Sequence, residues 1–241
     1  MKQYLYDTHT HTKETSSCGY LPAAEVVDRY VRNGFSGLVV TDHLHPEYLS
    51  RIDTEHNWDK VIDHYLSGYR AAKARGDEIG FDVILGAELR FPENDNDYLV
   101  YGIDEQWLRS NPYVCCMSAH EFFRKFHDQV LIIHAHPYRN GNTVVFEDAV
   151  HGSELINAHP RHENHNALAL ELCRRHPEYY RLAGSDTHES GDEARAGVLL
   201  PRRVHDSVAY KRMIEAHEFL LWSPEFQDFV DRDIELRRAY Q

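Results

Sequence analysis

A carboxylate and two imidazoles stand at alternate positions near the start of the chain, in the segment Asp7-Thr8-His9-Thr10-His11. Alternate side chains of an extended segment point to the same side, so the three groups converge. Imidazole and carboxylate together suit zinc, iron or manganese better than calcium or magnesium. The segment therefore predicts a transition-metal site, and a surface tract of histidine and threonine is the simpler alternative.

Metal-binding side chains also follow four later apolar runs, close to the point where each run ends. The segments are Thr41-Asp42-His43 after Leu38-Val39-Val40, Gly86-Ala87-Glu88 after Val83-Ile84-Leu85, His134-Ala135-His136-Pro137 after Leu131-Ile132-Ile133, and Ser185-Asp186-Thr187-His188 shortly after Leu182-Ala183. Taken singly, Asp42 could cap a helix and Glu88 could pair with Arg90. Because the carboxyl ends of parallel strands open onto one face of a barrel, we expect the five segments to meet there.

The apolar runs alternate with amphipathic segments of helical periodicity. The best defined covers residues 22–33, where Pro22 suits a first helical turn and Gly34 ends the pattern. Further helices are predicted at 58–75, 119–126, 163–175 and 208–217, and further strands at 98–101 and 155–156. Uninterrupted apolar strands between helices predict a parallel sheet with helices over its outer face. The acidic stretch 93–97 is interpreted as a solvated turn.

Composition limits the class of protein. The 241 residues are 42% hydrophobic and 27% charged, which suits a single globular domain over residues 1–241. A formal net charge of -13 disfavours binding to long nucleic acids. Four cysteines without paired spacing, and the lack of a signal-peptide or membrane-span pattern, predict a cytoplasmic protein with no membrane partner. The sequence does not indicate an oligomeric state.

In kind and in order, these segments resemble the signature of the PHP (polymerase and histidinol phosphatase) domain family of metal-dependent phosphoesterases. The signature reads Asp-x-His-x-His-Thr, Thr-Asp-His, a lone glutamate, Ala-His-Pro or Ser-His-Pro, and Ser-Asp-x-His, and all of its parts occur between Asp7 and His188. The resemblance implies an α/β fold, a single-domain distorted (β/α)7 barrel. It also implies two or three divalent transition-metal ions (Zn, Fe or Mn) at the C-terminal ends of the strands.

The resemblance gives each motif residue an expected role. His9 and His11 bind one ion with Asp186 and Glu88, Glu88 bridges to a neighbouring ion, His43 and His188 hold a second ion, and His136 joins Glu88 at a third. The side chains of Asp7, Asp42 and His134 are expected to support these ligands through hydrogen bonds rather than to bind metal.

Two positions depart from the family pattern. The loop after the first motif usually supplies an aspartate or histidine, whereas residues 15–19 read Thr-Ser-Ser-Cys-Gly. Cys18 is therefore either a thiolate ligand that favours zinc or a buried thiol. Many members also have a histidine near Leu99, where this chain has none. The ion beside His136 thus needs another ligand, for which His159 and water are the candidates.

Metal ions that share a carboxylate suit the hydrolysis of phosphate esters by a metal-activated hydroxide. The expected substrate is a small phosphomonoester, either histidinol-phosphate-like or a nucleotide. Arg139, Arg161 and Arg195 are the candidates for binding its phosphate, and His159 is a candidate ligand or proton donor. The alternatives are a phosphodiesterase or exonuclease of the same fold, an amidohydrolase-like enzyme that cleaves C-N bonds, and a metal-binding module without activity.

Overall fold

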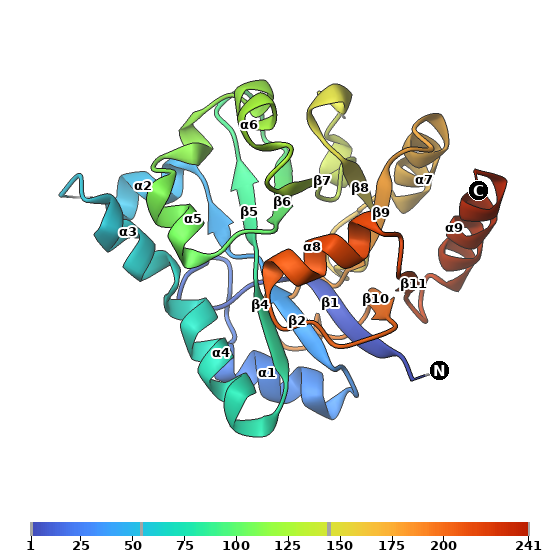
Figure 1. The fold of residues 1–241 in the computed structure, drawn as a ribbon, viewed down its shortest axis with the longest axis horizontal. Coiled ribbons are helices and arrows are strands. Elements are labelled where there is room, and N and C mark those ends of the chain that lie inside the picture. Colours follow the sequence, from blue (N-terminus) through green and yellow to red (C-terminus); the bar gives the residue numbers. More distant parts are fainter. Residues whose placement is uncertain (1, 54, 144–145, 241) are drawn as a thin grey trace.

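The computed structural model of the chain describes residues 2–53, 55–143 and 146–240. Its strands are β1 (Tyr4–Thr10), β2 (Gly37–Val40), β3 (His43–Leu44), β4 (Asp82–Leu85), β5 (Ala87–Arg90), β6 (Asp97–Tyr101), β7 (Leu131–His134), β8 (Gly152–Asn157), β9 (Tyr180–Gly184), β10 (Gly197–Leu200) and β11 (Leu220–Trp222). They form two mixed sheets with the orders β11-β10-β1-β2-β4 and β3-β5-β6-β7-β8-β9. Helices lie around the outside of these sheets (Figure 1).

Backbone hydrogen bonds join the two sheets on both sides. Between the ends of β9 and β1, the N–H of Asp186 donates to the carbonyl of His9 at 2.9 Å. On the other side, the N–H of Glu88 donates to the carbonyl of Asp42 at 3.1 Å. The predicted ligand segments at the ends of these strands are therefore neighbours in space. A closed seven-stranded barrel remains a prediction.

The sheets are mixed, so the prediction of a parallel sheet is wrong for part of the fold. The pairs β1–β2, β2–β4, β3–β5, β7–β8 and β8–β9 are parallel. The pairs β1–β10, β10–β11, β5–β6 and β6–β7 are antiparallel. Residues 91–96, which join β5 to β6, are too few for a parallel crossover, which takes about a dozen residues or more.

The helices are α1 (Ala23–Arg32), α2 (Pro46–Ile52), α3 (Trp58–Tyr65), α4 (Ser67–Ile79), α5 (Glu105–Ser110), α6 (Ala119–Phe126), α7 (Asn166–Arg175), α8 (Ser207–Glu215) and α9 (Gln227–Ala239). Short 3-10 turns cover Val114–Cys116, Arg139–Gly141 and Glu147–Ala149. The helices predicted at 22–33, 119–126, 163–175 and 208–217 are confirmed, with small shifts at their ends. Within the described residues, no helix is long and apolar enough to cross a membrane.

The helix predicted at 58–75 is two helices, because the chain breaks at Leu66 to pack against the loop that follows β1. A Cβ atom on Gly68 would lie 1.9 Å from Oγ1 of Thr12, so only glycine allows this approach. Oγ1 of Thr15 donates to the carbonyl of Tyr65 at 2.9 Å and accepts from the N–H of Gly68 at 3.2 Å. The break therefore braces the loop that carries the second predicted histidine ligand.

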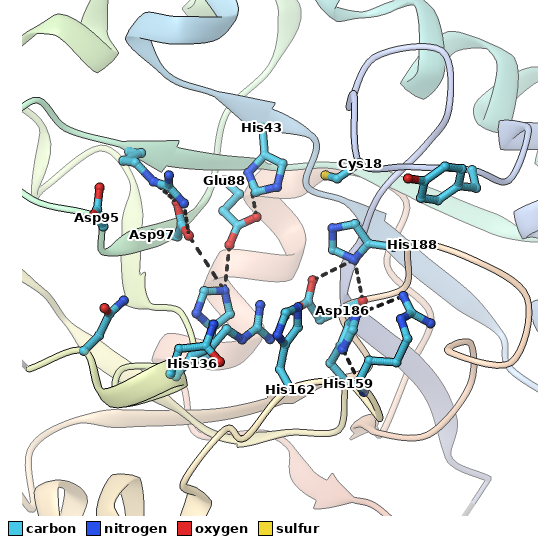
Figure 2. A pocket seen from close by; sticks show the side chains of 16 residues that line it. Cys18, His43, Glu88, Asp95, Asp97, His136, His159, His162, Asp186 and His188 are labelled. Carbon is cyan, nitrogen blue, oxygen red and sulfur yellow. Dashed lines mark hydrogen bonds and ion pairs between the residues drawn. The ribbon is translucent and has the colours of Figure 1, made fainter.

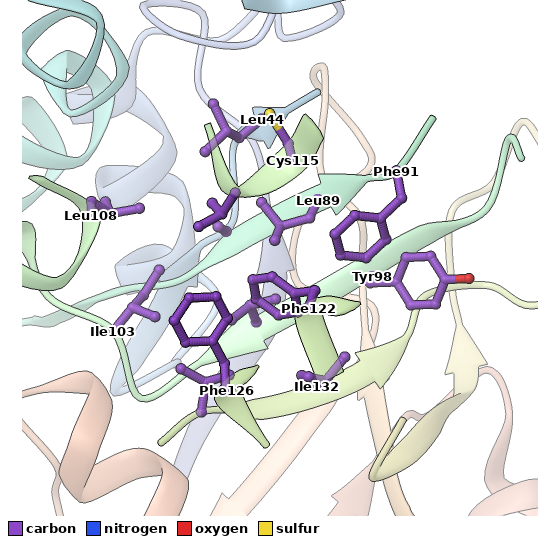
Figure 3. Close-up of a cluster of buried hydrophobic side chains, with 14 of the residues drawn as sticks. Leu44, Leu89, Phe91, Tyr98, Ile103, Leu108, Cys115, Phe122, Phe126 and Ile132 are labelled. Carbon is purple, nitrogen blue, oxygen red and sulfur yellow. The ribbon is translucent and has the colours of Figure 1, made fainter. Parts of the chain in front are cut away.

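Alternate residues of β6 belong to two different buried clusters. Leu99 and Tyr101 lie in one cluster, and Tyr98 and Val100 lie in the other. Figure 3 shows the second cluster, in which Phe122 of α6 packs among side chains of β5, β6 and β7. Burial of one such phenylalanine stabilises the fold by roughly 1.5–3 kcal/mol, so the strands that carry the ligand segments are held from outside.

Candidate metal centre

A cavity of about 520 Å³ lies where the ends of the strands meet (Figure 2). The predicted ligands that line it are His43 of β3, Glu88 of β5, His136 after β7, and Asp186 and His188 after β9. His9 and His11 have no exposed surface and contact Glu88 and Asp186 from the buried side. The structure thus brings the seven predicted histidine and carboxylate ligands together.

The position of the two histidines follows from the alternation of β1. His9 and His11 point to one side of the segment, and the threonines between and before them point to the other. The hydroxyl of Thr8 donates to a carbonyl of β9 at 2.9 Å, and that of Thr10 donates to a carbonyl of β2 at 2.8 Å. The threonines therefore fix β1 between its two neighbours, and the imidazoles are held at the cavity.

Four ligand atoms form a compact group, which we call the four-atom cluster: Nε2 of His9, Nε2 of His11, Oε2 of Glu88 and Oδ1 of Asp186. Nε2 of His9 lies 3.1 Å from Nε2 of His11, 3.3 Å from Oε2 of Glu88 and 3.4 Å from Oδ1 of Asp186. Nε2 of His11 lies 3.2 Å from each of these carboxylate oxygens. Ligand atoms around tetrahedral zinc with bonds of about 2.0–2.1 Å are about 3.3–3.4 Å apart. The spacing of the cluster therefore matches a single bound ion.

Two oxygens of this cluster lack hydrogen-bond partners. Oε2 of Glu88 and Oδ1 of Asp186 are both buried, and neither accepts a hydrogen bond within the described part of the chain. Buried polar atoms are normally paired, because an unpaired one loses its hydration without compensation. A divalent cation satisfies both oxygens at once. The residues present therefore fit a transition-metal ion.

The other oxygen of Glu88 faces a different histidine. Nε2 of His136 lies 3.1 Å from Oε1 of Glu88 and 4.0 Å from Oδ2 of Asp97. Glu88 can therefore bridge the four-atom cluster to an ion beside His136, with Asp97 as a possible further ligand. The interpretation of 93–97 as a solvated turn is wrong for Asp97, which is buried at the start of β6 and pairs with Arg90 at 2.8 Å.

A third group consists of the imidazoles of His11, His43 and His188. Their ligand atoms lie within 4.8 Å of one another, and Nδ1 of His43 is 3.0 Å from Oε2 of Glu88. Nδ1 of His188 donates to the carbonyl of Asp186 at 2.8 Å, which leaves Nε2 of that ring to bind metal. This group is compatible with a second ion held by His43 and His188.

The surroundings of the two carboxylate ligands favour their charged forms. Burial opposes the ionisation of Glu88, but the imidazoles of His43 and His9 outweigh it and hold the pKa of Glu88 well below its usual range. Burial likewise opposes the ionisation of Asp186, and Arg139 and His9 hold the pKa of that carboxyl well below its usual range. Both groups are therefore carboxylates at neutral pH, as a metal ligand must be.

Asp7 and Asp42 lie outside the four-atom cluster. Asp7 contacts the backbone of His9, and Asp42 contacts a serine that lies beside the ring of His11. Asp7 accepts hydrogen bonds from the N–H of His9 at 3.0 Å and from the backbone after β9 at 3.1 Å. Asp42 accepts from Oγ of Ser16 at 2.7 Å, and the same Oγ lies 3.3 Å from Nδ1 of His11. Both aspartates thus lie where they can support His9 and His11, and their supporting roles stay predictions.

The structure does not bring His134 to the ligands, in contrast to the expectation from the sequence. Its ring stacks on Tyr98 with centroids 5.1 Å apart, in the cluster that α6 covers. Burial and the nearby His136 lower the pKa of His134 to about 3. The backbone of His136 turns to a φ of 29°, so the two histidines do not continue one strand face.

Arg139, one of the three candidates for binding phosphate, lies against the predicted ligand Asp186. Its Nε donates to Oδ1 of Asn164 and its Nη2 to Oδ1 of Asn157, both at 2.9 Å, and its guanidinium pairs with Asp186. The side chain is largely buried and lines the cavity. A guanidinium fixed in this way is suited to bind an oxyanion.

The other two candidate arginines differ in their access to the cavity. Arg161 lines it, pairs with Asp192, and has Nη2 3.2 Å from Nε2 of His159. Burial lowers the pKa of His159 to about 3. Arg195 does not line the cavity and pairs with Glu225 instead. Nε of Arg195 donates to the carbonyl of Ala158 at 3.1 Å, and the side chain does not reach the cavity.

Cys18 lines the cavity but belongs to none of the ligand clusters found among the described residues. Burial raises the pKa of the Cys18 thiol to about 12, and the charges of Glu88 and Asp186 add to this effect. Cys18 is half-buried rather than buried, and its sulfur is not grouped with the candidate ligand atoms of the described chain. Its role as a ligand or as a thiol without metal therefore stays a prediction.

The sequence did not predict several side chains of the site, among them Arg90, Asp97 and Glu154. Arg90 lines the cavity beside Asp97. Glu154 lies wholly buried in β8, with Oε1 3.1 Å from Nδ1 of His9. A carboxylate next to the apolar pair 155–156 was the available indication for Glu154.

Comparison with known proteins gives one family and several solved structures of similar fold. The PHP domain profile matches residues 7–195. A two-domain protein from Bacteroides vulgatus, described as containing a predicted PHP-like metal-dependent phosphoesterase, has a TM-score of 0.66 at 14% identity over 92% of this chain, which spans 65% of that protein. PsfC from Pseudomonas syringae has a TM-score of 0.65 at 17% identity over 100% of both chains.

An amidohydrolase from Chromobacterium violaceum, which holds sulfate and no metal, has a TM-score of 0.54 at 16% identity over 92% of this chain and 99% of its own. At these identities the likeness concerns the fold alone. None of the curated proteins matches the sequence.

Proposed function

The chain belongs to the PHP domain family, and we propose that it is a metal-dependent phosphoesterase that hydrolyses a small phosphomonoester. The four-atom cluster carries this proposal. Its two carboxylate oxygens, Oε2 of Glu88 and Oδ1 of Asp186, are buried and lack hydrogen-bond partners within the described chain. Glu88 also turns its second oxygen to His136, so neighbouring ions would share one carboxylate. Centres of this kind favour displacement at phosphorus.

Different residues of the site are proposed to bind each of two or three ions of zinc, iron or manganese. We propose that His9, His11, Glu88 and Asp186 hold one ion, that His43 and His188 hold a second, and that His136 and Glu88 hold a third with the help of Asp97. When bound, the ions would activate water as the nucleophile and offset charge on the phosphate oxygens.

Arg139 is the residue that we propose to orient the phosphate. Its Nε and Nη2 donate to Asn157, Asn164 and Asp186, and Nη1 donates no hydrogen bond within the described residues. The fixed guanidinium can therefore offer Nη1 to a phosphate oxygen without first losing side-chain freedom.

His159 is proposed to orient Arg161 rather than to protonate the leaving group. Its lowered pKa of about 3 keeps the ring neutral at neutral pH, where a general acid needs a pKa near the working pH. The 3.2 Å contact between Nε2 of His159 and Nη2 of Arg161 fits a neutral ring that accepts a hydrogen bond.

The size of the cavity and the net charge of the chain favour a small phosphomonoester over a long nucleic acid. A cavity of about 520 Å³ lies within the range of small-molecule sites, and a net charge of -13 repels long polyanions. An amidohydrolase reaction is the alternative raised by the Chromobacterium violaceum protein. The sulfate in that protein is a tetrahedral oxyanion, which phosphate resembles more closely than an amide does.

The proposal is tested by a substrate panel with added Mn²⁺. Phosphomonoesters, a phosphodiester, short oligonucleotides and amides are compared at equal concentration, with His11→Ala and Asp186→Asn as variants. We expect release of phosphate from monoesters only, and its loss in both variants while far-UV circular dichroism shows a folded chain. Turnover of amides alone, or full activity in either variant, contradicts the proposal.

A further inference from the structure

Glu154 is a fully buried carboxylate for which the proposed chemistry has no use. It lies in β8 between two strands that lead to metal ligands, and none of its surface is exposed. A buried carboxylate is costly unless hydrogen bonds compensate for its lost hydration. Its partners therefore indicate why the chain keeps an acid at this position.

Three donors converge on the two oxygens of Glu154. Nδ1 of His9 lies 3.1 Å from Oε1. The backbone N–H of His136 and the Nδ2 amide of Asn157 both donate to Oε2 at 2.9 Å. Nε2 of His9 is one of the atoms of the four-atom cluster, where it would bind metal. The proton of this ring therefore belongs on Nδ1. A carboxylate, which accepts hydrogen bonds at both oxygens, satisfies all three donors.

The surrounding backbone is shaped to allow this contact. A Cβ atom on Gly184 of β9 would lie 2.6 Å from Cβ of His9 and 2.8 Å from Oε1 of Glu154, so glycine is required for their approach. His136 has a φ of 29°, which is strained for a residue with a side chain. The hydrogen bond from its N–H to Glu154 helps to hold that conformation.

We propose that Glu154 is a positioning residue that couples two metal positions. It holds His9 in the tautomer whose Nε2 binds metal, and it holds the backbone of His136 in the turn that directs its ring to Glu88. Carboxylates that accept a hydrogen bond from a metal-bound histidine act in this way in other metal sites. The proposal rests on the proposed metal centre and not on the identity of the substrate.

Glu154→Gln is the variant that tests this role. Whichever way the amide is turned, its NH₂ group meets a donor: Nδ1–H of His9 on one side, or the N–H groups of His136 and Asn157 on the other. We expect metal affinity to fall by about 10–100-fold, measured by competition of Zn²⁺ alone with a chromophoric chelator.

Glu163→Gln is the matched control, because its side chain is 75% exposed, and it is expected to bind Zn²⁺ as the natural chain does. Equal affinity in Glu154→Gln and the natural chain would overturn the proposal.

A second measurement needs no variant. Imidazole ¹⁵N resonances of the Zn²⁺-loaded natural chain are expected to show His9 with a proton on Nδ1 and metal on Nε2. A His9 ring without a proton on Nδ1 overturns the role of Glu154, even if Glu154→Gln does not fold. A lower Zn²⁺ affinity in Glu154→Gln and a proton on Nδ1 of His9, combined with no release of phosphate from any ester, would refute the proposed function and leave this inference intact.

Discussion

Replacing Glu88 with glutamine should disturb more than one metal position, because neighbouring ligand groups share this side chain. Its Oε1 lies 3.1 Å from Nε2 of His136, and its Oε2 lies 3.0 Å from Nδ1 of His43, 3.3 Å from Nε2 of His9 and 3.2 Å from Nε2 of His11. Glutamine keeps the size of the side chain but removes its charge and converts one oxygen into an NH₂ donor. Whichever way the amide turns, one set of ligand positions loses its oxygen.

The size of the effect follows from burial. Glu88 is 1% exposed, and removing one partner from a buried charge pair costs about 3–5 kcal/mol. Since about 1.4 kcal/mol corresponds to a tenfold change in affinity, the binding of metal should weaken roughly one hundred-fold to several thousand-fold. Glu163→Gln makes the same chemical change on the surface and should leave affinity unchanged.

Bound metal is counted by elemental analysis after dialysis, and affinity is measured by chelator competition. Glu88→Gln is expected to retain less than one ion per chain, with a far-UV circular dichroism spectrum like that of the natural protein. A folded Glu88→Gln chain that keeps the full metal content and affinity of the natural protein would refute the bridging role of Glu88.

Three further outcomes are expected. Cys18→Ser should bind as many metal ions as the natural chain, because Cys18 belongs to none of the ligand clusters among the described residues; elemental analysis that finds one ion fewer would make Cys18 a ligand. Arg139→Gln should raise the KM for a phosphomonoester by about tenfold or more, since a hydrogen bond to a charged group contributes about 1.5–3 kcal/mol; steady-state kinetics with an unchanged KM would contradict this. His151 accepts from the N–H of Ile132 at 3.0 Å, and burial lowers its pKa to about 4, whereas an unfolded histidine titrates near 6.5. The unfolded chain therefore binds more protons than the folded chain between these pH values, so His151 lowers the free energy of unfolding as pH falls from about 6.5 towards 4. Between pH 7 and pH 5, the free energy of unfolding measured with urea should fall less in His151→Gln than in the natural chain, and an equal fall would contradict this role of His151.

The candidate metal-binding segments could be recognised in the sequence because each one stands at a local boundary. A buried strand has to end where polar side chains begin, and His9, Glu88, His136 and Asp186 all stand at or beside such a boundary. Their convergence also needs the two sheets to meet, because His9 lies in β1 of one sheet, whereas Glu88, His136 and Asp186 lie in or after strands of the other. Local pattern was therefore sufficient to select these candidate ligands, and the pairing of distant strands places them around one cavity.

Pairing between distant segments explains what the sequence did not predict. Asp97 looks like part of an acidic turn, and it becomes buried because β6 folds back onto β5 and pairs Asp97 with Arg90. The sequence around Leu66 and Gly68 does not by itself mark the end of a helix. The predicted helix divides into α3 and α4 at Leu66, where the loop after β1 packs against it. Neither contact has a counterpart in the periodicity of its own segment.

Glu154 shows the same limit for the site. Its neighbours in sequence read as an ordinary buried strand, and its three donors come from β1, from the turn after β7 and from its own strand. Only the assembled fold shows that two of these donors belong to residues that we propose as metal ligands, His9 and His136. A polar residue in a buried strand thus indicates that a partner exists, but not which one.

Release of phosphate during a metal titration tests the central claim most directly. The protein is stripped with a chelator, dialysed, and assayed on a phosphomonoester panel while Mn²⁺ is added in known equivalents. We predict no activity without metal and a rise that levels off at two or three equivalents per chain. A chain that binds those equivalents in the cavity of Figure 2 and still hydrolyses none of the esters would contradict the account.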